Sequence, residues 1–432
     1  MANKQVMIFG WGDGNGLTMV DAITGAKLRE TSGGYTDDMV DILVSVASNR
    51  ILAIDWDHNI GLYDLDMVPI VTVRLGSTVA ALRSNSQQAI HIVGTSFYFM
   101  RKVGSPNNQA AADSERRLIE KYSLATGALE STIVLDATLY DAVGNATRFM
   151  GDNGHYALWT DTHIWILTAT GTHANKWVKI DLATGGVVDT IAQNVSLLDP
   201  YGSTRFVHDR DGTGGLIYVS YDMTHVWKVD FVAGTSAEIT LVPDNGGTLY
   251  GSPAYKPWLD LATSTWKFMN GADTHIVTLT FGATPTAEFQ ALGLGDLGAF
   301  EQVAFSYAGT TLGVYGIRGY SSKNLTTNTA TAVFLGDRIG VAQYDYLDME
   351  SLTIADLPEF QITGDVVWNN APVVRTVVMF DQSSHSKMST TSSTAGTYVL
   401  PCFTSDKKYV VCEAPDGTDF KIHAHLTPEA TA

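Results

Sequence analysis

A strand, a short turn and a second strand recur along the chain, and this repeat constrains the fold more than any other feature. Its clearest copy spans residues 177–191, WVKIDLATGGVVDTI, where apolar and polar residues alternate before the turn Ala183-Thr184-Gly185-Gly186. Alternation with a period of two is typical of a half-buried strand. Glycine tolerates the positive φ that a tight hairpin turn needs. The segment therefore predicts a β-hairpin.

Six other segments have the same shape, namely residues 17–31, 61–75, 119–135, 226–242, 276–292 and, more weakly, 342–357. We take as equivalent positions Asp21, Asp64, Ser123, Asp181, Asp230, Phe281 and Met349, which lie 43, 59, 58, 49, 51 and 68 residues apart. Periods near ~40–50 residues with several short strands each are typical of the blades of a β-propeller. The repeat therefore predicts an all-β protein with a β-propeller of about seven blades.

The best copies of the turn are IDLATG at residues 180–185, YSLATG at residues 122–127 and VDAITG at residues 20–25. They resemble the YVTN and quinoprotein-like family of β-propellers, in which a strand leads into an Asp-x-x-Thr-Gly turn and a second strand. The resemblance implies the fold. It implies no catalytic residue, because the motif is a structural signature.

The first copy is short of one strand. Propeller rings often close by pairing strands from the two ends of the domain, and we expect residues 354–361 to supply the missing strand. Two polar stretches, residues 104–117 and 320–331, are predicted to be exposed loops. Loops of this composition become ordered when something holds them, so at least one is expected to pack against another subunit or the neighbouring domain.

The pattern changes at Pro358. Residues 362–366, 377–381, 395–400 and 409–411 have strand-like patterns, and Ala371-Pro372-Val373 has the form of a turn. These elements resemble the carboxypeptidase-regulatory-like, transthyretin-like or Ig-like β-sandwich, a non-catalytic module of enzymes, surface proteins and phage virion proteins. We therefore predict a β-propeller over residues 1–358 and a small C-terminal β-sandwich over residues 360–432.

Both cysteines, Cys402 and Cys412, lie in this C-terminal segment and flank a predicted hairpin turn at residues 405–408. Opposite positions on paired strands would bring their Cβ atoms close enough for a disulfide. Synthesis in the cytosol favours thiols instead. The sequence leaves both states open and favours the thiols.

The net charge is −18, from 27 Lys and Arg against 45 Asp and Glu. This balance argues against nucleic-acid binding, which needs basic surface, and against an anionic membrane. It is typical of a soluble surface or of one matched to a basic partner. No apolar run approaches the ~20 residues of a membrane span. The N-terminus, MANKQVMIFGWGDGNG, has no apolar core and no cleavage site of a signal peptide, so we expect synthesis in the cytosol.

Motifs of catalysis and cofactor binding are missing from the sequence, including G-x-S-x-G, the phosphate-binding loop, H-E-x-x-H and C-x-x-C. Two segments are weak metal candidates. His208-Asp209-Arg210-Asp211-Gly212 begins like a calcium loop but has no matching Glu, and His423 and His425 share one face of a strand. A polar turn and a solvent-facing pair are the favoured interpretations. We therefore predict no catalytic, cofactor-binding or metal-binding residue, and no cofactor.

Fold does not determine function, so the functional hypothesis rests on the combination of domains. A propeller joined to such a sandwich is a construction used for binding and display outside cells, yet the sequence has no export signal. A tailed-bacteriophage virion protein, made in the host cytoplasm and exposed after lysis, satisfies both constraints.

We therefore expect a non-enzymatic structural or adhesion component of the tail, tail fibre, baseplate or head decoration. Its expected partners are other virion proteins, in multiple copies, and a host surface glycan or protein. Neither nucleic-acid binding nor membrane insertion is expected. The alternatives are a propeller enzyme, a hydrolase or lyase acting on glycans, and a cytosolic or cell-surface scaffold.

Overall fold

The computed structural model describes residues 3–10, 16–31, 39–55, 59–74, 90–103, 116–135, 157–168, 176–192, 205–208, 215–219, 226–230, 233, 235–239, 242–243, 258–260, 265–269, 275–280, 286–293, 300–306, 309–316, 319–334, 351–368, 371–373, 375–381, 387–392, 397–413, 420–426 and 428–430. Within these ranges the chain consists of strands and turns and contains no helix. The all-β prediction is confirmed for this part of the chain.

The described strands up to Pro358 form seven sheets, numbered here along the chain. Sheet 1 contains β29 (Ser351–Pro358), β1 (Asn3–Gly10), β2 (Leu17–Asp21) and β3 (Lys27–Glu30). Sheet 2 contains β4 (Met39–Ser45), β5 (Arg50–Asp55), β6 (Asn59–Tyr63) and β7 (Pro69–Arg74). Sheet 3 contains β8 (Ile90–Val93), β9 (Ser96–Val103), β10 (Arg116–Ser123) and β11 (Leu129–Val134). Sheet 4 contains β12 (Ala157–Trp159), β13 (His163–Thr168), β14 (Lys176–Asp181) and β15 (Val187–Ala192).

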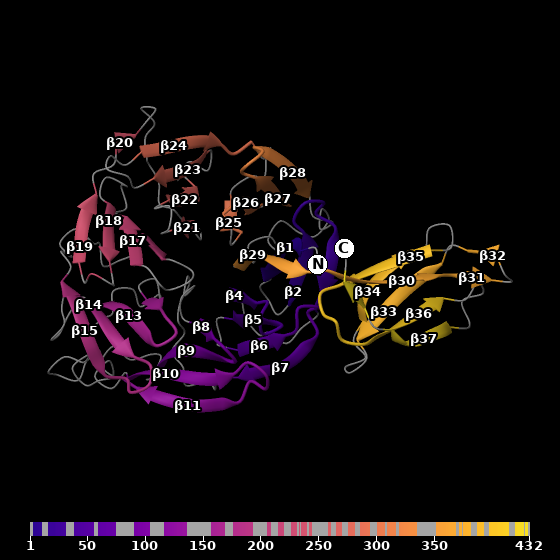
Figure 1. The fold of residues 1–432 in the computed structure, drawn as a ribbon, viewed down its shortest axis with the longest axis horizontal. Helices are drawn as coiled ribbons and strands as arrows, with labels where there is room; N and C mark the ends of the chain where they lie inside the picture. Colours follow the sequence, from indigo (N-terminus) through magenta and orange to yellow (C-terminus); the bar gives the residue numbers. More distant parts are fainter. Residues whose placement is uncertain are drawn as a thin grey trace, which may run out of the picture.

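Sheet 5 contains β16 (Arg205–His208), β17 (Gly215–Val219), β18 (Val226–Asp230) and β19 (Thr235–Ile239). Sheet 6 contains β21 (Trp258–Asp260), β22 (Thr265–Met269), β23 (His275–Thr280) and β24 (Thr286–Ala291), and β20 (Val242–Pro243) adds a parallel fifth strand beside β24. Sheet 7 contains β25 (Phe300–Phe305), β26 (Thr311–Gly316), β27 (Gly319–Asn324) and β28 (Thr329–Phe334). Figure 1 shows the sheets following one another in chain order around a ring.

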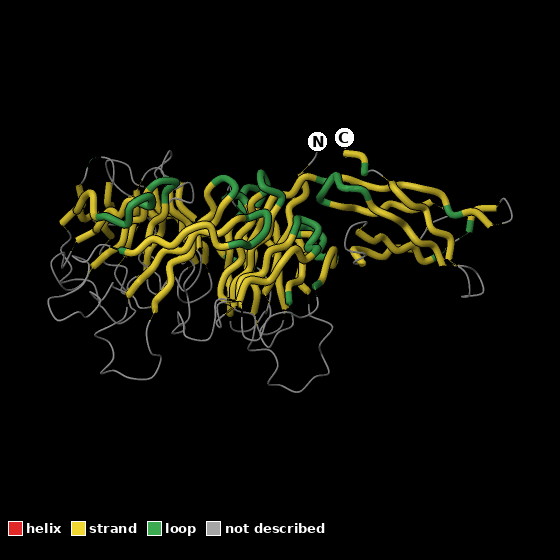
Figure 2. The backbone as a smooth tube through the Cα atoms, turned by 90° about the horizontal axis from the view of Figure 1, so that it is seen from below, coloured by secondary structure: helices red, strands yellow, loops and turns green. Residues whose placement is uncertain are grey.

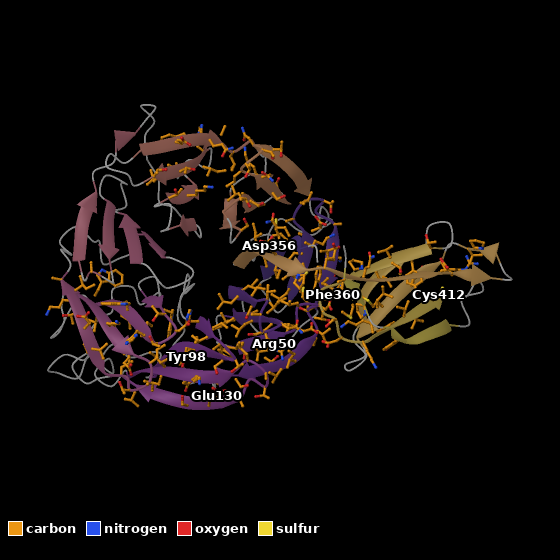
Figure 3. All side chains as sticks on the ribbon, in the orientation of Figure 1. Arg50, Tyr98, Glu130, Asp356, Phe360 and Cys412 are labelled. Carbon is orange, nitrogen blue, oxygen red and sulfur yellow. The ribbon has the colours of Figure 1, made fainter. Side chains whose placement is uncertain are left out.

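The core lies between neighbouring sheets, where side chains of both gather (Figure 3). One hydrophobic cluster joins sheets 1 and 2, a second joins sheets 2 and 3, and a third joins sheets 3 and 4. Further along the chain, hydrogen bonds from side chains to backbone carbonyl groups also join different sheets. Lys323 of sheet 7 donates to the carbonyl groups of Ala291 and Leu292 at the end of β24, both at 2.7 Å. Ser322 of the same strand donates to the carbonyl of Ala22 in sheet 1.

The strand that completes sheet 1 comes from the far end of the ring. β29 pairs with β1 in antiparallel register from Asn3 opposite Pro358 to Gly10 opposite Ser351. The predicted closing strand is therefore confirmed, but its bounds are Ser351–Pro358 and not residues 354–361. Residues from Phe360 onward belong to the next strand, β30 (Phe360–Asp365).

The repeated turn has one hydrogen-bond pattern in four sheets. A side-chain oxygen at the end of the third strand accepts the N–H groups two and three residues later, as in Asp181 with Ala183 at 3.0 Å and Thr184 at 2.8 Å. Asp21, Ser123 and Asn324 form the same pair of bonds. The residue four positions on has a positive φ in each turn, from 56° at Asn328 to 74° at Gly185.

This pattern corrects two predictions. The seventh equivalent position is Asn324, whereas Met349 lies outside the described residues. Residues 320–331 are not a loop along their whole length, because they form most of the hairpin of β27 and β28, and among residues 321–330 only those at and next to its tip, 326–330, are exposed. The polar residues of this segment favour a loop, but two of them are buried. Ser322 and Lys323 are 2% and 3% exposed, and their polar atoms bond to carbonyl groups of sheets 1 and 6.

The C-terminal strands pair among themselves in the described part of the chain. One sheet has the order β35 (Thr397–Cys402), β30, β38 (Glu429–Ala430), and a second has the order β34 (Lys387–Ser392), β33 (Thr376–Asp381), β36 (Lys408–Glu413), β37 (Phe420–Leu426). A small hairpin joins β31 (Val367–Trp368) and β32 (Ala371–Pro372). A hydrophobic cluster fills the space between the two larger sheets. Figure 2 shows the resulting two-layer unit, here called the C-terminal unit, beside the ring.

The predicted hairpin between the cysteines is wrong. Cys402 lies on β35 opposite Phe360, whereas Cys412 lies on β36 opposite Val377, and these strands belong to different sheets. Residues 403–407 carry the chain from one layer to the other, so the two cysteines are not cross-strand neighbours. Neither forms a disulfide.

Replacing Gly185 with alanine is expected to destabilise the fold more than replacing Gly94. Both glycines have positive φ, 74° and 57°, which costs a residue with a Cβ about 1–2 kcal/mol. A Cβ on Gly185 would also lie 2.3 Å from the carbonyl oxygen of Val134, whereas a Cβ on Gly94 meets no atom within 4 Å. Thermal unfolding of the two variants measures the difference. Equal losses of stability would contradict the close packing of this turn on sheet 3.

Candidate functional site at the buried junction

The turn of sheet 2 departs from the repeated pattern. Its residues are Asp64-Leu65-Asp66-Met67, one fewer than in the other turns, and Met67 takes the positive φ of 62°. The carboxylate of Asp64 accepts the N–H groups of Asp66 and Val68, each at 2.9 Å. The corresponding residues of the regular turns, such as Ala183 and Thr184, are exposed, but Asp66 is only 2% exposed. The altered turn thus directs a carboxylate into a buried position.

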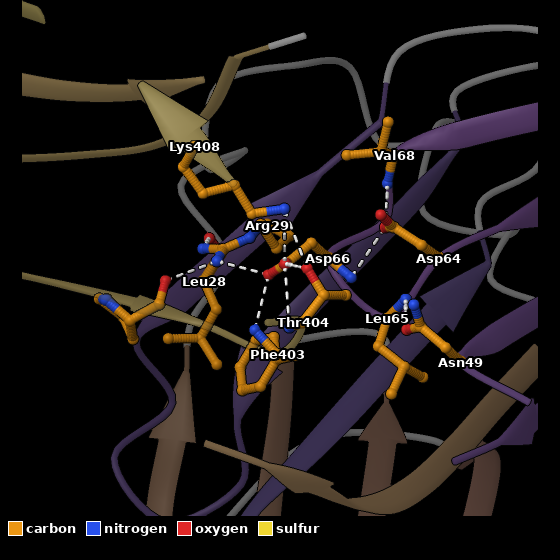
Figure 4. A network of polar contacts seen from close by, with 11 residues as sticks. Leu28, Arg29, Asn49, Asp64, Leu65, Asp66, Val68, Phe403, Thr404 and Lys408 are labelled. Atoms are coloured by element: carbon orange, nitrogen blue, oxygen red, sulfur yellow. Dashed lines mark hydrogen bonds and ion pairs between the residues drawn. The ribbon is translucent and has the colours of Figure 1, made fainter. Parts of the chain in front are cut away.

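The Asp66 carboxylate binds the C-terminal unit (Figure 4). Its Oδ1 accepts the N–H of Phe403 at 2.8 Å. Its Oδ2 accepts the N–H of Thr404 at 3.2 Å and the hydroxyl of the same residue at 2.7 Å. A carboxylate that accepts several N–H and O–H bonds is well satisfied without water. One side chain of the ring therefore holds the segment that links β35 to β36.

Two basic side chains neutralise Asp66, one from each part of the molecule. Arg29 of β3 donates from Nη2 to Oδ1 at 3.0 Å, and Lys408 of β36 lies with Nζ 3.5 Å from Oδ2. The side chains of Arg29, Asp66 and Lys408 are 2%, 0% and 0% exposed. Arg29 also donates to the carbonyl of Pro401 at 2.6 Å, and Lys408 donates to the Thr404 hydroxyl at 2.9 Å. We call these three charged residues with Phe403 and Thr404 the junction cluster.

Apolar side chains cross the junction in both directions. Phe403, from the C-terminal unit, belongs to the hydrophobic cluster of sheets 1 and 2. Val68, from the ring, belongs to the cluster inside the C-terminal unit. The guanidinium carbon of Arg29 lies 5.4 Å from the centre of the Phe403 ring, a cation–π arrangement. Because each part completes the core of the other, the two parts form one packed body.

The energetics of the junction make it rigid. A buried ion pair adds little net stability, because the attraction only offsets the loss of hydration. Removing one partner is different, since it leaves an uncompensated charge in a dry site and costs about 3–5 kcal/mol. Any hinge motion that separated Asp66 from Arg29 or Lys408 would meet the same penalty. The cluster therefore holds the C-terminal unit at one orientation.

A second contact ties down the connection between β29 and β30. Glu359, the residue between these strands, lies 3.4 Å from the amino group of Lys4 on β1, and the same amino group lies 3.0 Å from the carboxylate of Asp21. Burial lowers the pKa of Lys4, but the bonds to both carboxylates and their charges outweigh it and raise the pKa. The ammonium group is therefore charged and bridges the first turn and the linker.

Cys402 lies directly before the junction cluster and is fully buried. Burial, together with the charge of Asp66, raises the pKa of its thiol to about 12, although Arg29 and Lys408 act in the opposite direction. Because the thiolate is the reactive form, this thiol is inert in the folded protein. The cluster as a whole holds two parts together and presents no exposed acid, base or nucleophile.

Sequence reasoning did not select Arg29, Asp66 or Lys408. In the sequence, the segment that contains Asp66 is distinguished only as a copy of the repeat. The available signal was its departure from the best copies of that repeat, since it has a second aspartate and Met67 where the turns at residues 20–25, 122–127 and 180–185 have Thr-Gly. No comparable signal marks Arg29 or Lys408, whose partners lie far away in the chain.

The weak metal candidates of the sequence fall at the edge of the described chain or beyond it. His208 ends β16, and residues 209–212 lie outside the described residues. His423 and His425 lie on β37, where only the backbone is described. No group of three His, Cys, Asp or Glu side chains that could hold a metal ion occurs among the described residues. Residues 104–115 of the first polar stretch are also outside them, while Arg116 and Arg117 begin β10.

Comparisons with known proteins do not assign this chain to a family. No protein-family model matches the sequence, and no curated protein matches it. Among solved structures, the chain is similar to the crystal structure of a functionally unknown protein from Desulfotomaculum acetoxidans DSM 771. The identity is 12%, the TM-score is 0.47, and the alignment covers 81% of this chain and 98% of the other. Similarity at this level supports no conclusion about function.

Among the residues that the structure describes, none forms a helix long and apolar enough to cross a bilayer.

Replacing Asp66 with asparagine is expected to destabilise the junction by about 3–5 kcal/mol, because Arg29 and Lys408 then remain buried without a counter-charge. Cys402 provides a local probe of the loss. In a Cys412→Ser background, a thiol reagent at pH 8 should label Cys402 at least about 100-fold faster in the Asp66→Asn variant, since labelling follows the population of the open junction.

The matched control is Glu30→Gln, which breaks the exposed pair of Lys27 and Glu30, whose side chains are 61% and 54% exposed. Exposed pairs contribute about 0–1 kcal/mol, so labelling of Cys402 should stay close to that of the parent protein. Equal labelling of the Asp66→Asn variant and the parent would contradict a structural role for the cluster.

Proposed function

We propose that this protein is a non-enzymatic structural or adhesion component of a tailed-bacteriophage virion. In this proposal residues 1–358 form a seven-bladed β-propeller, and residues 360–432 form a transthyretin-like or Ig-like β-sandwich. The protein acts by position, with one part docked on the particle and the other facing outward. Its partners are other virion proteins and a host surface glycan or protein.

Three observations support the propeller. Seven sheets occur in the described chain before Pro358, and they follow one another around a ring (Figure 1). The closing strand β29 completes the sheet that begins with β1. The turns of sheets 1, 3, 4 and 7 share one hydrogen-bond pattern. A propeller accounts for all three with one repeated unit.

The observation that carries the functional proposal is the junction cluster. An accessory module that only brings an enzyme near its substrate can hang from a flexible linker. Here the two parts share hydrophobic clusters and a buried carboxylate with two basic partners. A fixed orientation matters when one part is anchored and the other must face a set direction. The rigid junction therefore favours a positional role over turnover.

Charge favours the C-terminal unit as the docking part. Residues 360–432 contain five Lys and Arg against seven Asp and Glu, so most of the net charge of −18 belongs to the ring. A near-neutral surface can be buried with little loss of charge hydration, whereas acidic rings repel one another in neighbouring copies. Figure 2 shows the C-terminal unit at the side of the ring, where it leaves both broad faces of the ring uncovered.

The test compares two valines of equal exposure. Val399 lies on β35, at the edge of a C-terminal sheet, and Val188 lies on β15, at the outer edge of sheet 4, and each is 54% exposed. We expect Val399→Asp to lower the number of copies in purified particles, because the aspartate would have to be desolvated at the dock. We expect Val188→Asp to assemble normally. Mass spectrometry of particles from cells that carry the gene measures both.

Three outcomes would overturn the proposal in different ways. Equal incorporation of both variants would refute docking through the C-terminal unit. Absence of the unaltered protein from particles, checked by immunogold labelling, would refute the virion role. Release of sugar products from a panel of glycans by the purified full-length chain would refute the non-enzymatic assignment and favour the propeller enzyme.

A further inference from the structure

Three aromatic side chains meet between sheets 3 and 4 near the centre of the ring. His91 lies on β8, the innermost strand of sheet 3 (Figure 1), and Trp159 lies on β12, the edge strand of sheet 4 at the opposite side from β15. Their rings are stacked with centroids 5.9 Å apart and planes 8° apart. Tyr98, labelled in Figure 3, pairs with His91 in the register of β8 and β9, and its ring lies 6.3 Å from that of Trp159. An imidazole thus forms part of the contact between two sheets.

His91 is poorly placed to carry a charge. Its Nε2 is buried and has no hydrogen-bond partner among the described residues. Burial lowers the pKa of His91 to about 4, although the carboxylate of Asp161, an exposed residue in the turn after β12, acts in the opposite direction. Asp161 acts on His91 through its charge, and Tyr98 lies opposite His91 on β9. Neither forms a hydrogen bond with Nε2 of His91.

Protonation would change the contact in two opposed ways. The imidazolium would gain a cation–π attraction to Trp159, worth about 0.5–2 kcal/mol. It would also place an N–H donor without an acceptor in a buried contact, which costs about 1–3 kcal/mol. The loss of hydration of the charge adds to this cost. The unpaired donor and the lost hydration together cost more than the cation–π attraction contributes, and burial lowers the pKa of His91 in the same direction. The charged ring is therefore stable only if it reaches water.

Among the described strands, each of the two that would have to move has a partner on one side only. β8 has four residues and pairs with β9, and β12 has three residues and pairs with β13. Short edge strands open locally at lower free energy than strands inside a sheet. Separation of β8 from β12 would expose His91 without breaking sheets 3 and 4 apart.

We propose that His91 makes the inner contact between sheets 3 and 4 acid-sensitive, so that its protonation separates β8 from β12. The ordinary pKa of histidine is 6.5, and the pKa in the closed contact is lower, so the open form binds the proton better. The stabilisation is complete above pH 6.5 and is lost as the pH falls toward 4. Mild acid would thus loosen the centre of the ring while its outer strands stay paired.

Hydrogen–deuterium exchange of the full-length protein tests this directly. At pH 5.0, after correction for the intrinsic rate, the opening equilibrium of β8 and β12 should be about 30-fold larger than at pH 7.5, the factor that the two pKa values give. His91→Phe keeps a flat ring against Trp159 but cannot be charged. In this variant the opening of the same strands should not change between the two pH values.

The matched control is His275→Phe, which removes an imidazole from β23, where it packs edge-on against Phe289 in sheet 6. This variant should keep the pH dependence of the parent protein at β8 and β12. If His91→Phe does not fold, His91→Gln serves in its place, because glutamine is also uncharged. An unchanged pH dependence in either His91 variant would overturn the proposal.

A titration gives an independent measurement on the unaltered chain. The nuclear magnetic resonance signal of His91, assigned by its absence in a His91 variant, should titrate well below the pKa of 6.5 of an ordinary histidine. Titration of this signal at the ordinary value in the folded protein would overturn the proposal.

Discussion

A carboxylate removed from water must find both hydrogen-bond donors and a counter-charge inside the protein, and the arrangement around Asp66 follows from this requirement. From the ring, Asp66 receives the counter-charge of Arg29. The hydrogen-bond donors of Phe403 and Thr404 and the second cation, Lys408, come from the C-terminal unit. The ring is thus incomplete without the C-terminal strands. The reverse also holds, because Val68 fills part of the hydrophobic cluster between the C-terminal sheets.

The sequence predicted what depends on local pattern. Alternation of apolar residues located the strands around Asp181, and the glycine after Thr184 located the turn, because both signals act within a few residues. The missing strand of sheet 1 was predictable for a different reason. A repeat with one strand too few needs a partner from elsewhere, and Ser351–Pro358 lies at the other end of the same repeat.

What the sequence could not predict depends on contacts between distant residues. Lys323 looked like part of a polar loop, but its amino group bonds to two carbonyl groups of sheet 6, and burial there lowers its pKa. Lys267 of sheet 6 bonds in the same way to the carbonyl of Gly309 in sheet 7, and its pKa is also lowered by burial. Arg50 bonds to Leu124 across sheets 2 and 3. The sequence alone does not distinguish a basic residue that forms such a contact from one that faces water.

The single residue between β29 and β30 has a mechanical consequence. Since Glu359 alone separates the closing strand from the first strand of the C-terminal unit, tension on that unit passes directly into β29. β29 is held to β1 along eight residue pairs, from Ser351 to Pro358. A pull along the strand axis therefore loads these bonds together, in shear, and does not unzip them one by one. Part of the load reaches sheets 1 and 2 by a second route, through Arg29 and Asp66, so the terminal strand does not bear it alone.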